Sequence, residues 1–170
     1  YNITNYQIFE GDINNFKTDK KYDFVVSYGL IEHFENPEQI IEKHKEVVDE
    51  DGYLCITVPN MRYFNYLFNY IFSRELLETH NLSIMDLKLL KKLIIDNDFE
   101  EIYASYYLTS MFQANKDSQR LKEHPYLSKI YNAINNIMER LNLENIPNKF
   151  ASPYIVVIAK RKNKQKSKEK

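Results

Sequence analysis

The order of apolar and polar positions along the chain predicts alternating strands and helices. Short runs rich in β-branched and aromatic residues predict strands, and apolar residues spaced by three or four predict helices. The expected strands cover residues 6–9, 22–28, 53–58, 102–108 and 154–159. The expected helices run from Pro37 to Asp51 and over residues 61–77, 83–97 and 127–141. This order favours an α/β fold.

The clearest part of the pattern is a strand, a helix and a second strand between residues 22 and 58. Residues 22–28 lack polar alternation, which is typical of a strand covered on both faces of a parallel sheet. Asn36 can cap the helix and Pro37 suits its first position, while Gly52 ends it. These elements form the βαβ unit of a parallel sheet.

An aromatic stretch follows in residues 61–77. Phe64, Phe68 and Phe72 recur every four residues, so this stretch predicts an amphipathic helix with an aromatic flank. Such a helix can serve as a substrate lid, a homodimer or partner face, or a membrane-surface element. Its few Lys and Arg residues favour a lid or a partner face.

Charge is unevenly placed in the 170 residues, which hold 23 Lys plus Arg and 24 Asp plus Glu. Residues 161–170 form a basic tail that we expect to be disordered, because a short run of one charge buries no apolar surface. A solvated tail is favoured over a nucleic-acid or membrane contact. A domain spanning residues 1–160 is therefore expected before this tail.

The single cysteine, Cys55, excludes an internal disulfide and a cysteine metal cluster. A reducing compartment, the cytoplasm, is therefore expected. The apolar runs are too short for a transmembrane segment, and the first residues lack a signal-peptide pattern. The chain begins at Tyr1 rather than at Met, so it can be a piece of a longer protein.

Several stretches resemble class I S-adenosylmethionine-dependent methyltransferases. They are Tyr-Asp-Phe-Val-Val-Ser-Tyr-Gly-Leu-Ile-Glu-His-Phe at 22–34, Asn-Pro-Glu at 36–38, Asp-Gly-Tyr-Leu-Cys-Ile-Thr-Val-Pro-Asn at 51–60, and weaker matches at 80–86, 98–102 and from 152 onward. The resemblance implies a Rossmann-like seven-stranded sheet with flanking helices and an antiparallel last strand. The chain would enter this sheet just before the third strand, with helical insertions near 61–82 and 109–150.

The resemblance also implies S-adenosylmethionine as cofactor and methyl transfer to an oxygen or nitrogen of a small-molecule or glycan-like acceptor. The family's glycine-rich loop is missing, because Gly11, Gly29 and Gly52 lie far apart. The acidic residue expected to hold the ribose is missing as well. We therefore expect the chain alone to bind the cofactor poorly and to be inactive.

Cofactor-binding candidates follow two of the expected strands. Asp12 could accept a hydrogen bond from the adenine amino group while Ile13 packs against the ring, as the resemblance implies; alternatively, Asp12 is a turn residue held by its own backbone. Gly29 allows a ligand to approach the backbone closely. Ser27 and Tyr28 could line the same cleft, or Tyr28 could be a packing residue.

The catalytic candidates are two histidines. A neutral His33 could take a proton from the acceptor, and His80 is a second candidate for this base. Alternatively, His33 fixes its loop and His80 is a surface residue, because an activated sulfonium donor needs no base when acceptor and methyl are aligned. Some relatives hold a metal with a glutamate three residues before the Glu-His pair. Here that position is Gly29, so no metal is expected.

Two other functions compete with the enzyme. A non-catalytic methyltransferase-like module could bind a partner through the aromatic helix and the basic tail. A different nucleotide-binding enzyme, such as a dehydrogenase, is less favoured because Glu32 and His33 have no evident role in that chemistry.

Overall fold

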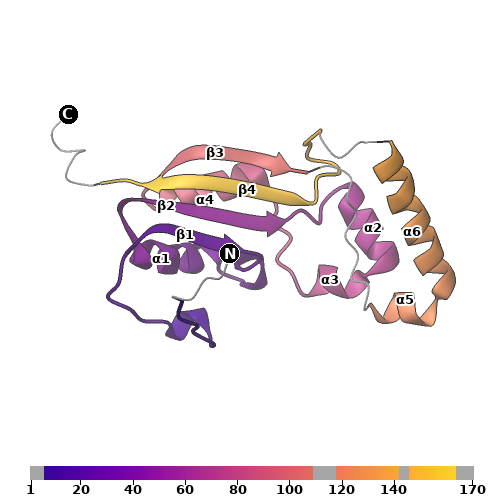
Figure 1. Cartoon of the computed structure of the whole chain (residues 1–170), viewed down its shortest axis with the longest axis horizontal. Coiled ribbons are helices and arrows are strands. Elements are labelled where there is room, and N and C mark those ends of the chain that lie inside the picture. The colour runs from indigo at the N-terminus through magenta and orange to yellow at the C-terminus, as the bar shows by residue number, and fades with distance from the viewer. Residues whose placement is uncertain (1–5, 109–117, 142–145, 164–170) are drawn as a thin grey trace.

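The computed structural model describes residues 6–108, 118–141 and 146–163 (Figure 1). Its strands are β1 (Tyr22–Tyr28), β2 (Val48–Pro59), β3 (Phe99–Tyr107) and β4 (Tyr154–Arg161). They form one sheet in the order β1-β2-β4-β3, with β1 parallel to β2 and β4 antiparallel to both of its neighbours. The expected α/β class and the antiparallel last strand are confirmed.

The helices follow the predicted order closely. They are η1 (Ile13–Asn15), η2 (Ile31–His33), α1 (Pro37–Val47), α2 (Phe64–Phe72), α3 (Arg74–Glu78), α4 (Leu87–Asp96), α5 (Gln119–Glu123) and α6 (Pro125–Arg140). Helix α1 begins as predicted, and the Asn36 side chain accepts a hydrogen bond from the Gln39 amide. The prediction that this helix runs to Asp51 is wrong, because it ends at Val47 and β2 begins at Val48. Helix α4 begins later than expected: Asp86 caps it, and Ser83 instead bonds to Asn81.

The prediction of one helix over residues 61–77 is wrong, because the helix breaks at Ser73. In a continuous helix the Phe72 carbonyl would accept a hydrogen bond from the next turn. Here it accepts a 2.9 Å bond from the Ser118 hydroxyl, and α3 starts in a new direction at Arg74. A contact distant in sequence thus ends α2.

The strand expected at residues 6–9 is also absent. Among the described strands β1 pairs only with β2, and residues 6–10 pair with no strand. The side chain of Ile8 is 80% exposed, so this apolar run gains no burial that would hold it against the sheet.

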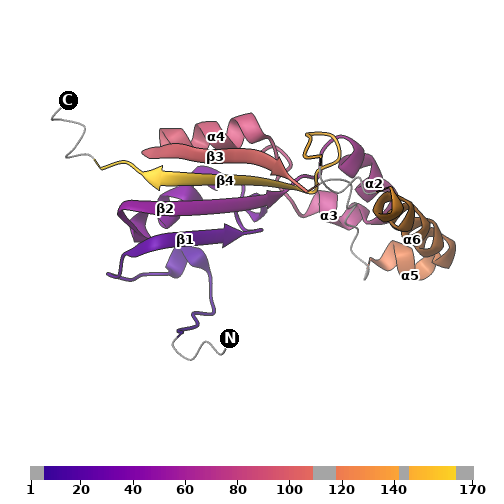
Figure 2. The same cartoon turned by 45° about the horizontal axis from the view of Figure 1, so that its top comes forward.

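The main core lies on one face of the sheet. Helices α1 and α4 cover this face, and Figure 2 shows α4 beside β3 and β4. Alternate residues of the central strands are buried beneath them: Leu54, Ile56, Val58, Ile155, Val157 and Ala159. On the other face Phe24, Val26 and Tyr28 are exposed. The expectation that residues 22–28 are covered on both faces is therefore wrong, because the described helices pack on only one face.

A second core joins the two segments that we expected to be insertions. Phe68 and Phe72 of α2 pack against Tyr131 of α6, with ring centroids 5.6 Å and 5.9 Å away from that of Tyr131. Leu121 and Leu127 complete this cluster. Figure 1 shows the resulting helical unit, α2 with α5 and α6, beyond the carboxyl ends of β1 and β2.

Strand β4 continues through Arg161, whose guanidinium donates a hydrogen bond to the Val48 carbonyl. The Lys162 amide donates to the Asp98 carbonyl. Residues 164–170 of the expected basic tail lie outside the described residues. None of the described helices combines the length and the apolar character needed to cross a membrane.

Candidate active site

The candidate active site begins where β1 ends. Gly29 has a φ of +60°, a conformation that glycine adopts without strain. Its amide donates a 3.0 Å hydrogen bond to the Thr57 carbonyl of β2, which fixes the exit of the chain from the sheet. A Cβ atom at this position would lie 3.4 Å from Oε1 of Glu32. The Glu32 carboxyl therefore lies against the open backbone of Gly29.

Glu32 is buried in the short helix η2. Its side chain is 1% exposed, and its Oε2 atom has no hydrogen-bond partner among the described residues. Burial raises the pKa of Glu32, while its own backbone amide and the neighbouring His33 oppose this rise. A buried carboxyl with an unpartnered oxygen is costly for the fold, so it points to a functional role.

A loop from another part of the chain brings His80 to this site. The Asn81 amide donates a 2.7 Å hydrogen bond to the Glu32 carbonyl, and the Asn81 side chain donates to the Phe34 carbonyl at 3.1 Å. These two bonds tie the loop after α3 to η2. As a result, the ring centroids of His33 and His80 lie 4.5 Å apart.

The ring of His80 is held in one orientation. Its Nδ1 atom lies 2.6 Å from the Leu76 carbonyl oxygen. Because a carbonyl only accepts, Nδ1 carries the proton, and Nε2 keeps its lone pair. Burial lowers the pKa of His80, which favours the neutral ring. A pocket of about 470 Å³ adjoins both histidines, with Glu35, Glu78 and Thr79 in its walls.

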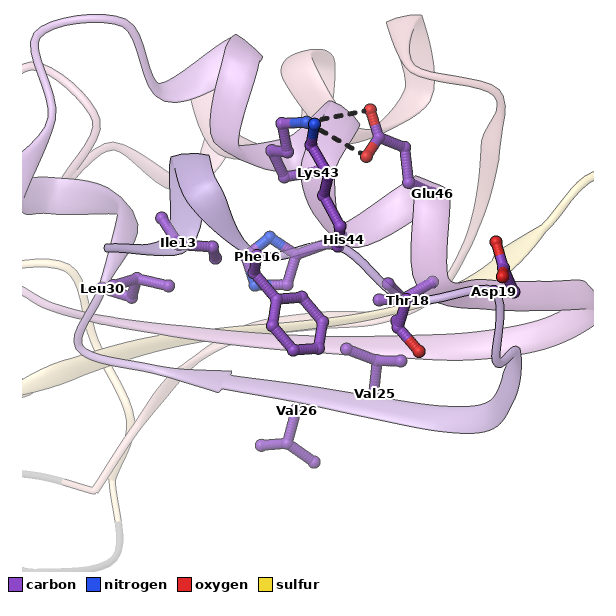
Figure 3. A pocket seen from close by; sticks show the side chains of 12 residues that line it. Ile13, Phe16, Thr18, Asp19, Val25, Val26, Leu30, Lys43, His44 and Glu46 are labelled. Carbon is purple, nitrogen blue, oxygen red and sulfur yellow. Dashed lines mark hydrogen bonds and ion pairs between the residues drawn. The ribbon is translucent and has the colours of Figure 1, made fainter. Parts of the chain in front are cut away.

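Asp12 and Ile13 lie at the start of η1. The Asp12 carboxylate accepts hydrogen bonds from the Asn14 amide and side chain at 2.9 Å and 3.0 Å, which is the local turn arrangement considered as its alternative role. Ile13 and Leu30 lie at the same end of a pocket of about 500 Å³ between this loop, β1 and α1 (Figure 3). Ile13 therefore lies near the segment that follows β1.

Ser27 and Tyr28 lie on opposite faces of the sheet. Ser27 is 3% exposed and its hydroxyl has no partner among the described residues. Tyr28 is 68% exposed on the open face, where a hydrogen bond with Tyr154 raises the pKa of the Tyr28 hydroxyl. The structure thus brings His33 and His80 together with Glu32, which lies beside Gly29, but it does not bring Tyr28 into the pocket of Ile13.

Sequence reasoning missed two residues of this site. Glu32 was considered only as a member of the Glu-His pair, and no local pattern shows that an oxygen of its carboxyl is buried without a partner. Asn81 ties the His80 loop to η2, and the sequence carries no sign of its distant bonds. His44, by contrast, is a packed core histidine on the buried face of α1: it is 5% exposed, and its Nδ1 lies 2.6 Å from the Ile40 carbonyl.

A family model described as a methyltransferase domain matches residues 2–148. No curated protein matches the chain.

Solved structures share the fold at low sequence identity. The chain is similar to a possible histamine N-methyltransferase from Thermotoga maritima (TM-score 0.57, 13% identity), covering 91% of this chain and 63% of that one. It is also similar to a Galdieria sulphuraria protein assigned as a sarcosine dimethylglycine methyltransferase (TM-score 0.52, 12% identity), covering 88% of this chain and 57% of that one. A third similar structure is that of the [4+2]-cyclase SpnF (TM-score 0.51, 12% identity), with 89% of this chain and 54% of that one covered. The chain spans less than two thirds of the length of each.

Proposed function

Because the chain belongs to the methyltransferase family, we propose that the protein transfers a methyl group from S-adenosylmethionine to an oxygen or nitrogen of a small-molecule or glycan-like acceptor. The observation that carries this proposal is the convergence of Glu32, His33 and His80 beside Gly29 at the carboxyl end of β1. In open α/β sheets, ligands bind at this end of the strands. We place the reaction in the cytoplasm because a lone cysteine suits a reducing compartment.

On the acceptor side, either of the two histidines can serve as the base. The Nε2 lone pair of His80 or the ring of His33 accepts a proton where the acceptor must lose one. The sulfonium is already activated, so holding the acceptor in line with the methyl group supplies much of the rate. Gly29 leaves room beside the strand end for the reacting groups.

On the cofactor side, we propose that Asp12 accepts a hydrogen bond from the adenine amino group and that Ile13 packs against the ring. This requires the Asp12 carboxylate to keep an acceptor position free beside its bonds to Asn14, which two carboxylate oxygens allow. Ser27 and Gly29 complete the proposed cofactor contacts at the strand end, whereas Tyr28 lies on the opposite, open face of the sheet and takes no part in them.

Calorimetric titration with S-adenosylhomocysteine tests this function. We expect micromolar binding by the full-length gene product and much weaker binding by the 170-residue chain, which lacks a glycine-rich loop. Asp12→Ala should weaken binding to the full-length product, and the exposed Asp96→Ala is the matched control that should not. Absence of binding by both folded proteins would refute the proposal.

A second candidate function rests on α2. Tyr66 and Tyr70 stack at 6.4 Å with an interplanar angle of 17°, and both rings are 44% exposed. The neighbouring Leu67 is 56% exposed. This face suits a protein partner or a second copy of the chain, so a module that binds a partner is the alternative if no cofactor binds. Sedimentation of the protein and of Leu67→Glu would detect a homodimer formed through this face.

A further inference from the structure

Three potential metal ligands converge beside the strand end. Glu32, His33 and His80 each offer one ligand atom, and these atoms all lie within 4.8 Å of one another. We propose that these three side chains bind a divalent transition-metal cation of the zinc type. Two imidazole nitrogens and one carboxylate oxygen form a donor set that suits such a cation. The proposed metal site does not depend on the proposed methyl transfer.

The burial of Glu32 is the second observation that points to a cation. Its side chain is 1% exposed, and Oε2 has no hydrogen-bond partner among the described residues. An ordinary surface carboxylate needs no explanation, but a buried one without a partner destabilises the fold. A bound cation would offset the cost of burying the carboxylate.

The His80 ring is oriented as metal-binding histidines usually are. Its Nδ1–H donates to the Leu76 carbonyl at 2.6 Å, so the Nε2 lone pair is available to a cation. The loop that carries this ring is fixed by the 2.7 Å bond from the Asn81 amide to the Glu32 carbonyl. The same contact therefore positions two of the three ligands.

The site leaves room for a further ligand. Three protein ligands leave a tetrahedral cation with one open position, as in catalytic zinc sites. The adjoining pocket of about 470 Å³ provides space for water or for an oxygen or nitrogen of another molecule. While the cation holds both imidazoles, neither His33 nor His80 can accept a proton, so the base role proposed above applies to the cation-free site.

The expectation of no metal rested on Gly29, which stands where some relatives have a further glutamate. The structure supplies a third donor from elsewhere, because the loop after α3 carries His80 to the Glu32–His33 pair. The spacing of residues around Gly29 could not show this contribution.

Titration of Zn²⁺ into the metal-free full-length protein, followed by calorimetry, tests the site. We expect one Zn²⁺ per chain, with X-ray absorption showing two imidazole ligands. Glu32→Gln and His80→Asn should each weaken binding by about 100-fold or more, since even residues that only support metal ligands contribute about 10- to 100-fold. His124→Asn is the matched control, because His124 is exposed and lies outside the cluster.

The outcomes separate this proposal from the methyltransferase proposal. The metal site is refuted if the protein binds no Zn²⁺, or if Glu32→Gln and His80→Asn leave the Zn²⁺ affinity unchanged. This conclusion holds whether or not S-adenosylhomocysteine binds to the protein. Circular dichroism checks that each variant is folded. If the buried Glu32→Gln variant unfolds, the half-buried His80→Asn variant still decides the result.

Discussion

Replacing Ser152 with alanine should destabilise the protein through two lost hydrogen bonds. Ser152 is fully buried, and its hydroxyl donates to the Leu108 carbonyl at 2.6 Å and accepts from the Asn148 amide at 2.8 Å. Each such bond contributes about 1 kcal/mol to stability, and the variant removes both bonds. The free energy of unfolding should therefore fall by about 2 kcal/mol.

Urea unfolding followed by circular dichroism measures this loss. With an m-value of about 2 kcal/mol per molar urea, the midpoint should fall by about 1 M. Ser128→Ala is the control, because its hydroxyl makes one longer bond, 3.3 Å, to the Leu121 carbonyl. That variant should lose less than about 1 kcal/mol. A loss for Ser152→Ala no greater than for Ser128→Ala would refute this reasoning.

Three further predictions follow from the packing, the backbone and the buried histidine. Phe72→Ala should reduce the free energy of unfolding by about 3–5 kcal/mol in the same urea assay, because Phe72 is 3% exposed in the second core. Leu67→Ala is its control: Leu67 is 56% exposed, so this variant should change the free energy of unfolding by less than about 1 kcal/mol. Gly29→Ala should cost about 1–2 kcal/mol in thermal unfolding, because a φ of +60° strains a residue with a Cβ; an unchanged melting temperature would contradict this. Burial lowers the pKa of His44 in the folded state, so on acidification the unfolded state binds a proton at a higher pH than the folded state does. The contribution of neutral His44 to the free energy of unfolding is therefore fully present above the pKa of the unfolded state and is lost as the pH falls through and below that pKa. Urea midpoints at about pH 7.5 and about pH 5.5 should show a larger decrease for the natural protein than for His44→Gln, and equal decreases would rule this out.

The sequence predicted elements best where the signals are local. Residues 22–28 form β1 as expected, and Asn36 and Pro37 mark the start of α1, because a strand run and a helix cap depend on near neighbours. The break at Ser73 was missed because it depends on Ser118, which lies far along the chain. Pairing between strands also depends on residues far apart in the sequence. The strand prediction at residues 6–9 was wrong because it rested on apolar character alone.

The site was predictable only in part for the same reason. His33 and His80 were each candidates, but their meeting depends on bonds that Asn81 makes to η2. The buried state of Glu32 depends on how η2 packs, which no spacing in the sequence reveals. Residue types thus suggested the chemistry, whereas tertiary contacts determined which groups share one pocket.

The attachment of the helical unit has a consequence for evolution. The Asn60 and Asn65 side chains both donate to the Ser152 carbonyl, at 2.8 Å and 2.9 Å, where the chain leaves and re-enters the sheet. Beyond this junction, α2, α5 and α6 are buried against one another in their own core. That core contains no residue of the sheet, so substitutions that keep it packed leave the contacts within the sheet unchanged. A lineage could therefore remodel the helical unit while the strand ends stay unchanged.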